Sequence, residues 1–244
     1  MSVIVYVLYT DESTLMQELT PVILIDELHA ARGHVKRTLA TLLQSEFTKV
    51  YEAVPQSTGA YEFNSQAVAR RRLKNTCLDF HSTLNTNISI ARAKTQYDQA
   101  DRVAALSALV SHPSVERDQA LAHFHAFAAG DPLMLNKWFS FQAMADTPGL
   151  LQQVPTHIHS IITGYQSGVI TPFTSLPASQ GSQAALPLSN PNRARSLVSV
   201  FGGNHVHFHA QSGEGYAFIA DTVIELDALN PQVRAVIVIM TSIV

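Results

Sequence analysis

Apolar residues recur at steps of three and four positions through most of this 244-residue chain. Such spacing aligns apolar side chains along one face of an α-helix, whereas a half-buried strand needs strict alternation. The pattern therefore predicts an all-α chain built from several amphipathic helices. The apolar stripes run from Leu39 to Val54, Leu73 to Leu84, Val103 to Val110, Leu121 to Phe127, Leu133 to Met144 and Tyr216 to Leu226.

Capping residues divide this pattern into separate helices. Asp131-Pro132, Asn190-Pro191 and Asn230-Pro231 each place a short polar side chain before a proline, which is typical of a helix start. Gly130 and the pair Gly202-Gly203 lie where the preceding helices should end. Short connections favour antiparallel neighbours, so we expect helical hairpins stacked into a superhelix, an ARM/TPR-like solenoid.

Composition excludes several classes of protein. Hydrophobic residues make up 46% of the chain and charged residues 14%, which is unlike a chain that is disordered throughout. The net charge of −3 provides no basic field, so we expect no nucleic-acid partner. No clean apolar run reaches the roughly 18–20 residues of a membrane span. We therefore expect a soluble, intracellular protein with no membrane partner, in the cytoplasm or an organelle lumen.

The histidines are the first candidates for chemistry. His205, His207 and His209 form the densest group, and alternating imidazoles on a strand could share a zinc ion. No carboxylate lies beside them in the sequence and two glycines precede them, so we interpret the segment as a polar loop rather than a dedicated metal site. The H-E-x-x-H, G-x-S-x-G, P-loop and G-x-G-x-x-G motifs are absent. The sequence thus predicts no catalytic residue and no metal ligand here, these three histidines being only weak candidates.

Other reactive or charged side chains have structural interpretations. Cys77, the single cysteine, lies in an apolar stripe and is interpreted as a packing thiol. Arg70-Arg71-Arg72 with Lys74 is interpreted as a solvated helix face. We expect Trp138 to pack between helices and Lys137 to extend to solvent.

Arg193 and Arg195 fall in the first turns of the helix that Asn190 is expected to begin. Cations at a helix N-terminus oppose the helix dipole, so the position itself does not favour them. They are either two solvated arginines or cations placed to meet an anion such as a carboxylate.

Eight motifs occur in a consistent order along the chain and cover most of residues 34–145 and 190–233. They are Thr38-Leu39-Ala40-Thr41, Ala69-x-Arg71-x-Leu73-x-Asn75-x-Cys77-Leu78, Ala104-Ala105-Leu106-Ser107-Ala108, Lys137-Trp138-Phe139 with Gln142-Ala143, Asn190-Pro191-Asn192-Arg193-Ala194-Arg195-Ser196-Leu197, Phe208-His209-Ala210, Gly213-x-Gly215-Tyr216 and Asn230-Pro231-Gln232-Val233. Together they resemble the C-terminal domain of bacterial-type aminopeptidase N.

The resemblance implies a part of a zinc-dependent alanyl aminopeptidase, a metallopeptidase of the gluzincin type. It implies a helical domain that closes over the catalytic domain and lines the cavity through which peptides reach the zinc. Arg195 matches the second arginine of the family's N-P-N-R-x-R motif, which faces that channel, and Arg193 is a minor candidate for a channel or anion contact. The zinc ligands belong to an earlier domain, so we expect this chain alone to be inactive. Its expected partner is an aminopeptidase catalytic domain, in cis or in trans.

The chain departs from that family pattern in three segments, which we treat as separate from the helical domain. We expect an unmatched extension over 1–20, superhelical parts over 21–154 and 190–233, an uncharged flexible insertion over 155–189 and an unmatched apolar tail over 234–244. On this division the superhelix is incomplete at its C-terminal end. The alternative function is a stand-alone helical-repeat module that binds proteins or peptides on a concave surface.

Overall fold

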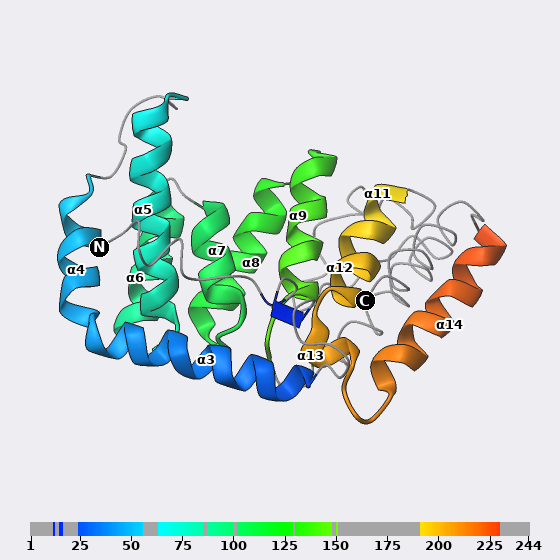
Figure 1. Ribbon diagram of the computed structural model, residues 1–244. Helices are drawn as coiled ribbons and strands as arrows, with labels where there is room; N and C mark the ends of the chain where they lie inside the picture. The colour runs from blue at the N-terminus through cyan, green and yellow to red at the C-terminus, as the bar shows by residue number, and fades with distance from the viewer. Residues whose placement is uncertain are drawn as a thin grey trace. The chain divides into compact units, whose positions relative to one another are not determined.

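The computed structural model describes residues 12, 15–16, 24–55, 63–84, 87–99, 102–128, 130–147, 150 and 191–229. Every regular element within these ranges is helical, so the predicted all-α fold is confirmed (Figure 1). The expected insertion over 155–189 and the expected tail over 234–244 lie outside the described residues, as does most of 1–20. None of the helices in the described ranges combines the length and apolar character that crossing a membrane requires.

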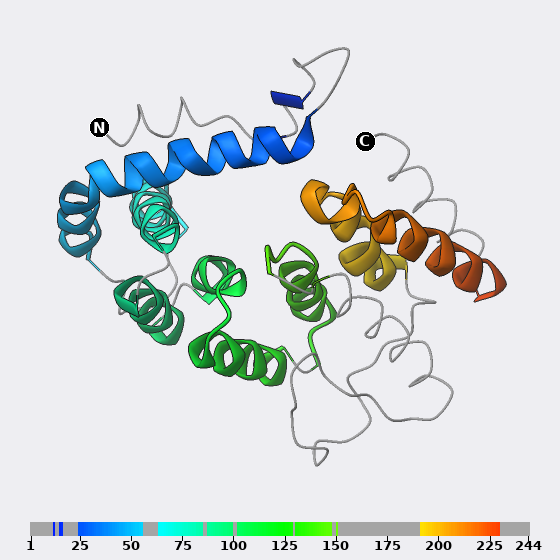
Figure 2. The ribbon, with the colours of Figure 1, turned by 90° about the horizontal axis from the view of Figure 1, so that it is seen from below.

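Residues Met1–Arg117 form the first of two compact units. Helices α4 to α7 stand side by side, and Figure 2 looks roughly along their axes, while α3 runs across this direction. Helices next to one another in the chain also pack together in space, as expected of stacked hairpins. The helices are α3 (Ile25–Leu42), α4 (Gln44–Ala53), α5 (Ser65–Ser82), α6 (Asn87–Gln99) and α7 (Arg102–Val110).

The core of this unit lies where α3, α4 and α5 meet. The Phe47 and Phe80 rings stack with centroids 4.6 Å apart, and Ala40 and Cys77 are buried beside them. The stripe from Leu39 to Val54, predicted as one helix, spans two helices because the backbone leaves the helical region at Leu43. The apolar spacing continues across this corner because α3 and α4 both face the same core.

Residues Asp118–Val244 form the second compact unit. Its first helix, α8, begins three residues before the boundary, at Val115. Within this unit α9 packs against the continuous helical run formed by α11, η1 and α12. The elements are α8 (Val115–Phe127), α9 (Pro132–Ala143), α11 (Pro191–Ala194), η1 (Arg195–Ser199), α12 (Val200–Gly202), α13 (His205–Phe208) and α14 (Glu214–Leu229).

The connection between α8 and α9 follows the sequence prediction at the end of α8 and at the start of α9. Gly130 has φ of 89°, a left-handed conformation that glycine adopts without steric cost. Asp131 caps α9, because its Oδ1 accepts hydrogen bonds from the amides of Leu133 at 2.9 Å and Met134 at 3.2 Å. The buried Trp138 joins the two helices, its Nε1–H donating to the Leu121 carbonyl at 3.0 Å. Lys137 is exposed, as expected.

The packing of α13 against α14 depends on Gly215. A Cβ at this position would overlap the carbonyl group of Phe208, at the end of α13. Only a residue without a side chain allows this approach. Helix α14 covers the stripe predicted from Tyr216 to Leu226, with Phe218 and Ile219 buried.

Candidate functional site

Arg195 lies on the outer side of a helical run that begins at Pro191. Proline at the first helical position is the start that the sequence predicted, although Asn190 itself lies outside the described residues. The Arg195 side chain is exposed, and within the part of the chain that the structure describes its guanidinium makes no hydrogen bond or ion pair. The side chain of Arg193 lies outside the described residues.

The helical run contains one π-turn, η1, which starts at Arg195. The amide of Val200 donates to the carbonyl of Arg195, five residues earlier, and to that of Leu197. In an α-helix that amide would donate to the carbonyl of Ser196, four residues earlier. At the π-turn the Val200 amide therefore donates to carbonyls other than that of Ser196.

Ser140 on α9 provides a donor to that carbonyl. Its Oγ lies 3.0 Å from the Ser196 oxygen and 3.0 Å from the Asn136 oxygen, which belongs to its own helix. Ser196, Leu197 and Val198 are buried on the side of the run that faces the core. Arg195 is thus held on a helix whose opposite face is fixed against α9. A guanidinium group presented in this way can bind a carboxylate or a peptide carbonyl through paired N–H donors.

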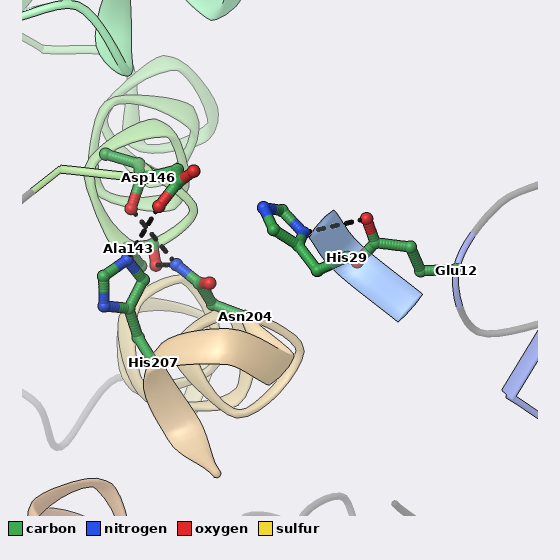
Figure 3. A network of polar contacts seen from close by, with 7 residues as sticks. Glu12, His29, Ala143, Asp146, Asn204 and His207 are labelled. Atoms are coloured by element: carbon green, nitrogen blue, oxygen red, sulfur yellow. Dashed lines mark hydrogen bonds and ion pairs between the residues drawn. The ribbon is translucent and has the colours of Figure 1, made fainter. Parts of the chain in front are cut away.

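Asn204 joins the corner between α12 and α13 to the C-terminal end of α9. Its Nδ2 donates to the carbonyls of Ala143 at 3.1 Å and Ala145 at 3.2 Å, which Figure 3 shows from close by. Carbonyls at a helix end have no helical donor, so a buried amide satisfies them. Nothing in the sequence indicated this joint, because its partners lie about 60 residues apart.

The three histidines of the Asn204–His209 segment do not face one point. The segment is not the predicted loop, because His205–Phe208 forms one helical turn, α13. Residues four apart share a helix face, so the rings of His205 and His209 stack with centroids 6.0 Å apart. His207 instead lies 3.2 Å from Asp146, a carboxylate that the fold brings from the end of α9 (Figure 3).

The His205–His209 pair is partly enclosed. His209 Nδ1 lies 2.5 Å from the hydroxyl of Tyr216 on α14. Burial, and then the neighbouring His205, lower the pKa of His209. In the described ranges no three His, Cys, Asp or Glu side chains are grouped in a way that could hold a metal ion. The geometry therefore gives His209 a contact with α14, and His207 a contact at the end of α9.

A polar cluster in the first unit was not predicted from the sequence. Arg92 on α6 reaches Glu52 at 3.2 Å and Thr48 at 3.3 Å, both on α4. Its Nη1 also lies 3.3 Å from Nε2 of the buried His81 on α5. A guanidinium group can only donate, so His81 Nε2 accepts and its proton lies on Nδ1. Burial first, and then the charge of Arg92, lower the pKa of His81.

Two further sequence interpretations concern α5. Cys77 is 2% exposed within the core, and burial raises the pKa of its thiol to about 11. The packing role is confirmed, because a reactive cysteine needs an accessible thiolate. In the basic run, Arg70 and Arg72 are exposed while Arg71 is half-buried. Lys74 bonds through Nζ to the carbonyl of Val54 at 3.1 Å and lies over the ring of Tyr51.

The chain is similar to known aminopeptidases. The aminopeptidase N of Caulobacter vibrioides is 31% identical over 213 residues, which is 85% of this chain and 22% of the relative. That of Escherichia coli is 30% identical over 225 residues, 90% of this chain and 23% of the relative. The crystal structure of Legionella pneumophila aminopeptidase A in complex with aspartic acid matches with a TM-score of 0.67 and 25% identity, covering 89% of this chain and 24% of that chain. The chain thus spans about a quarter of the length of these proteins.

A family model described as a domain of unknown function, DUF3458_C, with ARM repeats matches residues 6–160 and 181–240. The matched ranges contain Ser140, Arg195 and Asn204. They also extend into both end segments that the sequence analysis set apart, and they leave out residues 161–180. These matches confirm the resemblance to the C-terminal domain of aminopeptidase N, and the chain belongs to the DUF3458_C family of ARM-repeat domains.

Proposed function

We propose that this chain acts as the helical domain of an aminopeptidase N-like zinc enzyme, covering the catalytic domain and lining the route by which peptides reach the zinc. The observation that carries the proposal is the near-complete coverage of this chain by two aminopeptidases N, of which it represents about a quarter. A match of that extent supports the interpretation that the chain corresponds to one domain-sized part of the larger enzyme.

The chemistry of hydrolysis is assigned to a partner domain. A zinc peptidase needs a metal-bound water and a base. In the H-E-x-x-H motif the two histidines bind the zinc and the glutamate is the base, all on one helix. That motif does not occur in this sequence, and of the clustered histidines His207 pairs with Asp146 and His209 with Tyr216. The residues present do not fit a catalytic zinc, so we place the zinc in the catalytic domain, in cis or in trans.

Arg195 is the residue through which this domain acts on peptides. Its exposed guanidinium stands on a face fixed by the burial of Ser196 to Val198. Paired N–H donors suit a peptide carboxylate or carbonyl. Arg193 is proposed as a second, minor contact for the same anionic group.

The first experiment measures the size of the endogenous polypeptide with an antibody raised against residues 190–233. A band far above 26.6 kDa supports the proposal, because the chain is then a part of a complete aminopeptidase. A band near 26.6 kDa that co-precipitates a zinc peptidase domain supports a partner in trans. A band of that size without such a partner contradicts the proposal and favours the stand-alone interaction module.

The second experiment tests Arg195 in the assembled enzyme. We expect Arg195→Ala to raise KM for alanine-initiated peptides of several residues by about tenfold, in keeping with a charge-assisted contact. Arg37→Ala is the matched control, because Arg37 is also exposed but lies on α3. Equal kinetics for the two variants would show that Arg195 does not contact the peptide on its route to the zinc. Peptidase activity of the pure 244-residue chain would contradict the expectation that this chain alone is inactive.

A further inference from the structure

His81 is a buried titratable group in contact with three neighbouring helices. It lies on α5, which packs against both α4 and α6 (Figure 1), and it is 3% exposed. The rings of Phe47 and Tyr51 on α4 lie edge-on to its imidazole, with centroids 6.4 Å and 6.2 Å away. Nη1 of Arg92, on α6, lies 3.3 Å from its Nε2. A change in the charge of His81 is therefore felt by α4 and α6 as well as by α5.

A proton and Arg92 compete for the same atom of His81. A neutral imidazole has one ring nitrogen that accepts, and the guanidinium of Arg92, which only donates, uses it. A protonated imidazole carries hydrogen on both nitrogens and has no acceptor left. Protonation would also place two like charges at hydrogen-bonding distance. The contact between His81 and Arg92 therefore exists only while His81 is neutral.

The folded chain favours that neutral form. Burial is the largest cause that lowers the pKa of His81, and the charge of Arg92 is the second. A hydrogen bond with the backbone of Phe47 and the charge of Glu52 act in the opposite direction but do not reverse the shift. Because the folded-state pKa lies below the ordinary value of about 6.5, the contact is fully present above about pH 6.5 and is lost as the pH falls through the folded-state pKa.

The other charged side chains around this part of α5 have different contacts. Lys74, on α5 itself, lies over the ring of Tyr51 at 4.8 Å from the centroid. Lys36 of α3 pairs with Asp79 at 2.8 Å. Helix α7 also packs against α5, but among the described residues it contributes no charge to the shift at His81. The response to acid is therefore set by the groups from α4 and α6.

Arg92 can leave His81 by moving toward solvent. Its side chain is 22% exposed and that of its partner Glu52 is 65% exposed, so their ion pair can persist while the guanidinium moves outward. Nη1 of Arg92 also donates to Thr48 Oγ1 at 3.3 Å, so this contact with α4 would change at the same time. Helix α6 would then lose one bond to α5 and one to α4.

The second half of α6 has a separate tie to α5. Nε2 of the buried Gln96 donates to Oδ1 of Asn75 at 2.7 Å, and neither amide titrates. Gln96 lies one turn after Arg92 in α6. The loss of the Arg92 contacts should therefore loosen the part of α6 around Arg92 more than the part that follows Gln96.

We propose that the His81–Arg92 contact is an acid-sensitive latch: a proton on His81 Nε2 displaces Arg92 and loosens the first half of α6 from α4 and α5. The inference concerns the first unit alone and does not depend on the proposed aminopeptidase role. It requires that His81 and Arg92 influence each other reciprocally, which gives two independent tests.

The first test is an NMR pH titration of the histidine imidazoles in the full chain, with the His81 signal assigned by its loss in His81→Gln. We expect Arg92→Met to raise the pKa of His81, because the competing donor and its charge are removed. Arg37→Met, which removes an exposed arginine from α3, is the matched control and should leave that pKa unchanged. If Arg92→Met does not fold, Arg92→Gln removes the charge with a smaller change of the side chain. An unchanged or lower pKa of His81 in the folded variant would overturn the inference.

The second test is hydrogen exchange at pH 7.5 and pH 5, corrected for the intrinsic rate at each pH. In the wild type we expect protection at the amides of residues 91–94 to be about tenfold lower at pH 5, with less than about twofold change at residues 96–99 and in α9. His81→Gln offers an acceptor that does not titrate, so it should abolish the response. His34→Gln removes an exposed histidine from α3 and should retain it.

Two results of the exchange experiment would overturn the latch. The first is the same pH response at residues 91–94 in the wild type and in His81→Gln, because His81 would then not be its source. The second is an equal loss of protection in both halves of α6 and in α9, which would indicate a general loss of stability in acid.

Discussion

Two polar joints, one in each unit, tie helices together by different means. In the first unit the charged Arg92 bonds to Glu52, Thr48 and His81, and its side chain is 22% exposed. In the second, the neutral Asn204 is 8% exposed and bonds to two backbone carbonyls. The Arg92 joint depends on charge and protonation, whereas the Asn204 joint depends on burial and exact placement. This difference predicts which joint is stronger and which responds to pH and salt.

The largest effect is expected from Asn204→Ala. Two carbonyls at the end of α9 would lose their donor inside the protein, which should lower the free energy of unfolding by about 3 kcal/mol. Urea unfolding followed by circular dichroism measures this loss. Asn204→Asp is the matched control, because it keeps the shape, removes the donor and should be at least as unstable. A loss below about 0.5 kcal/mol would show that the Asn204 bonds are replaced by water.

Arg92→Ala should be the second largest, at about 2 kcal/mol, because three hydrogen bonds to α4 and α5 are lost but water reaches part of the site. Arg92→Lys keeps the charge without the planar fork of donors, so it should recover less than half of the loss. Urea unfolding at low and high salt measures both variants. If lysine restores full stability, the contribution of Arg92 is its charge alone and the geometric account of the cluster is wrong.

The Arg92 joint should also make the free energy of unfolding depend on pH, because it includes His81. Its pKa is lowered in the folded chain, so below about pH 6.5 the unfolded chain binds more protons than the folded chain. The free energy of unfolding should therefore fall as the pH decreases below about 6.5. Arg92 and Glu52 are the charged groups facing His81, and the ring of Tyr51 lies at its edge.

His81→Asn should flatten this dependence in part, because His112 and His209 also have lowered pKa values and contribute the rest. Unfolding measured at several pH values between 5 and 8 gives the two slopes. An identical slope for the wild type and His81→Asn would mean that His81 does not change protonation on folding.

The smallest effect is expected at the surface of the first unit, where Lys36 and Asp79 form an ion pair at 2.8 Å. The Asp79 side chain is 56% exposed, so solvent screens the pair. Asp79→Asn should cost at most about 0.5 kcal/mol, and the cost should vanish in 1 M salt. A cost as large as that of Arg92→Ala would show that exposure does not decide the strength of these joints.

Local signals in the sequence predict the helices well. The limits of α9 follow from Asp131-Pro132 and from the end of its apolar stripe, and both agree with the structure. The break at Leu43 could not be predicted, because neither glycine nor proline marks it and the apolar spacing continues through it. The same limit explains α13, where the two preceding glycines suggested a loop and the fold forms a helical turn.

The candidate site was predictable only in part. Arg195 was found through the resemblance to a family and not through a physical signal of its own. The partners that give it a defined setting, Ser140 and the Ser196 carbonyl, lie 56 residues apart in the sequence. The contact between His207 and Asp146 spans 61 residues. Such pairs depend on tertiary packing, which residue spacing within one helix does not encode.

The π-turn also affects how this chain should be compared with its relatives. Because the turn contains one residue more than an α-turn, a relative with a regular helix here has one residue fewer between the residues that match Pro191 and Gly202. In a sequence alignment the difference appears as a single-residue gap, and its correct position lies within 195–199 rather than in the neighbouring loop. The presence or absence of that gap would sort relatives into those that share the π-turn and those that have a regular helix here.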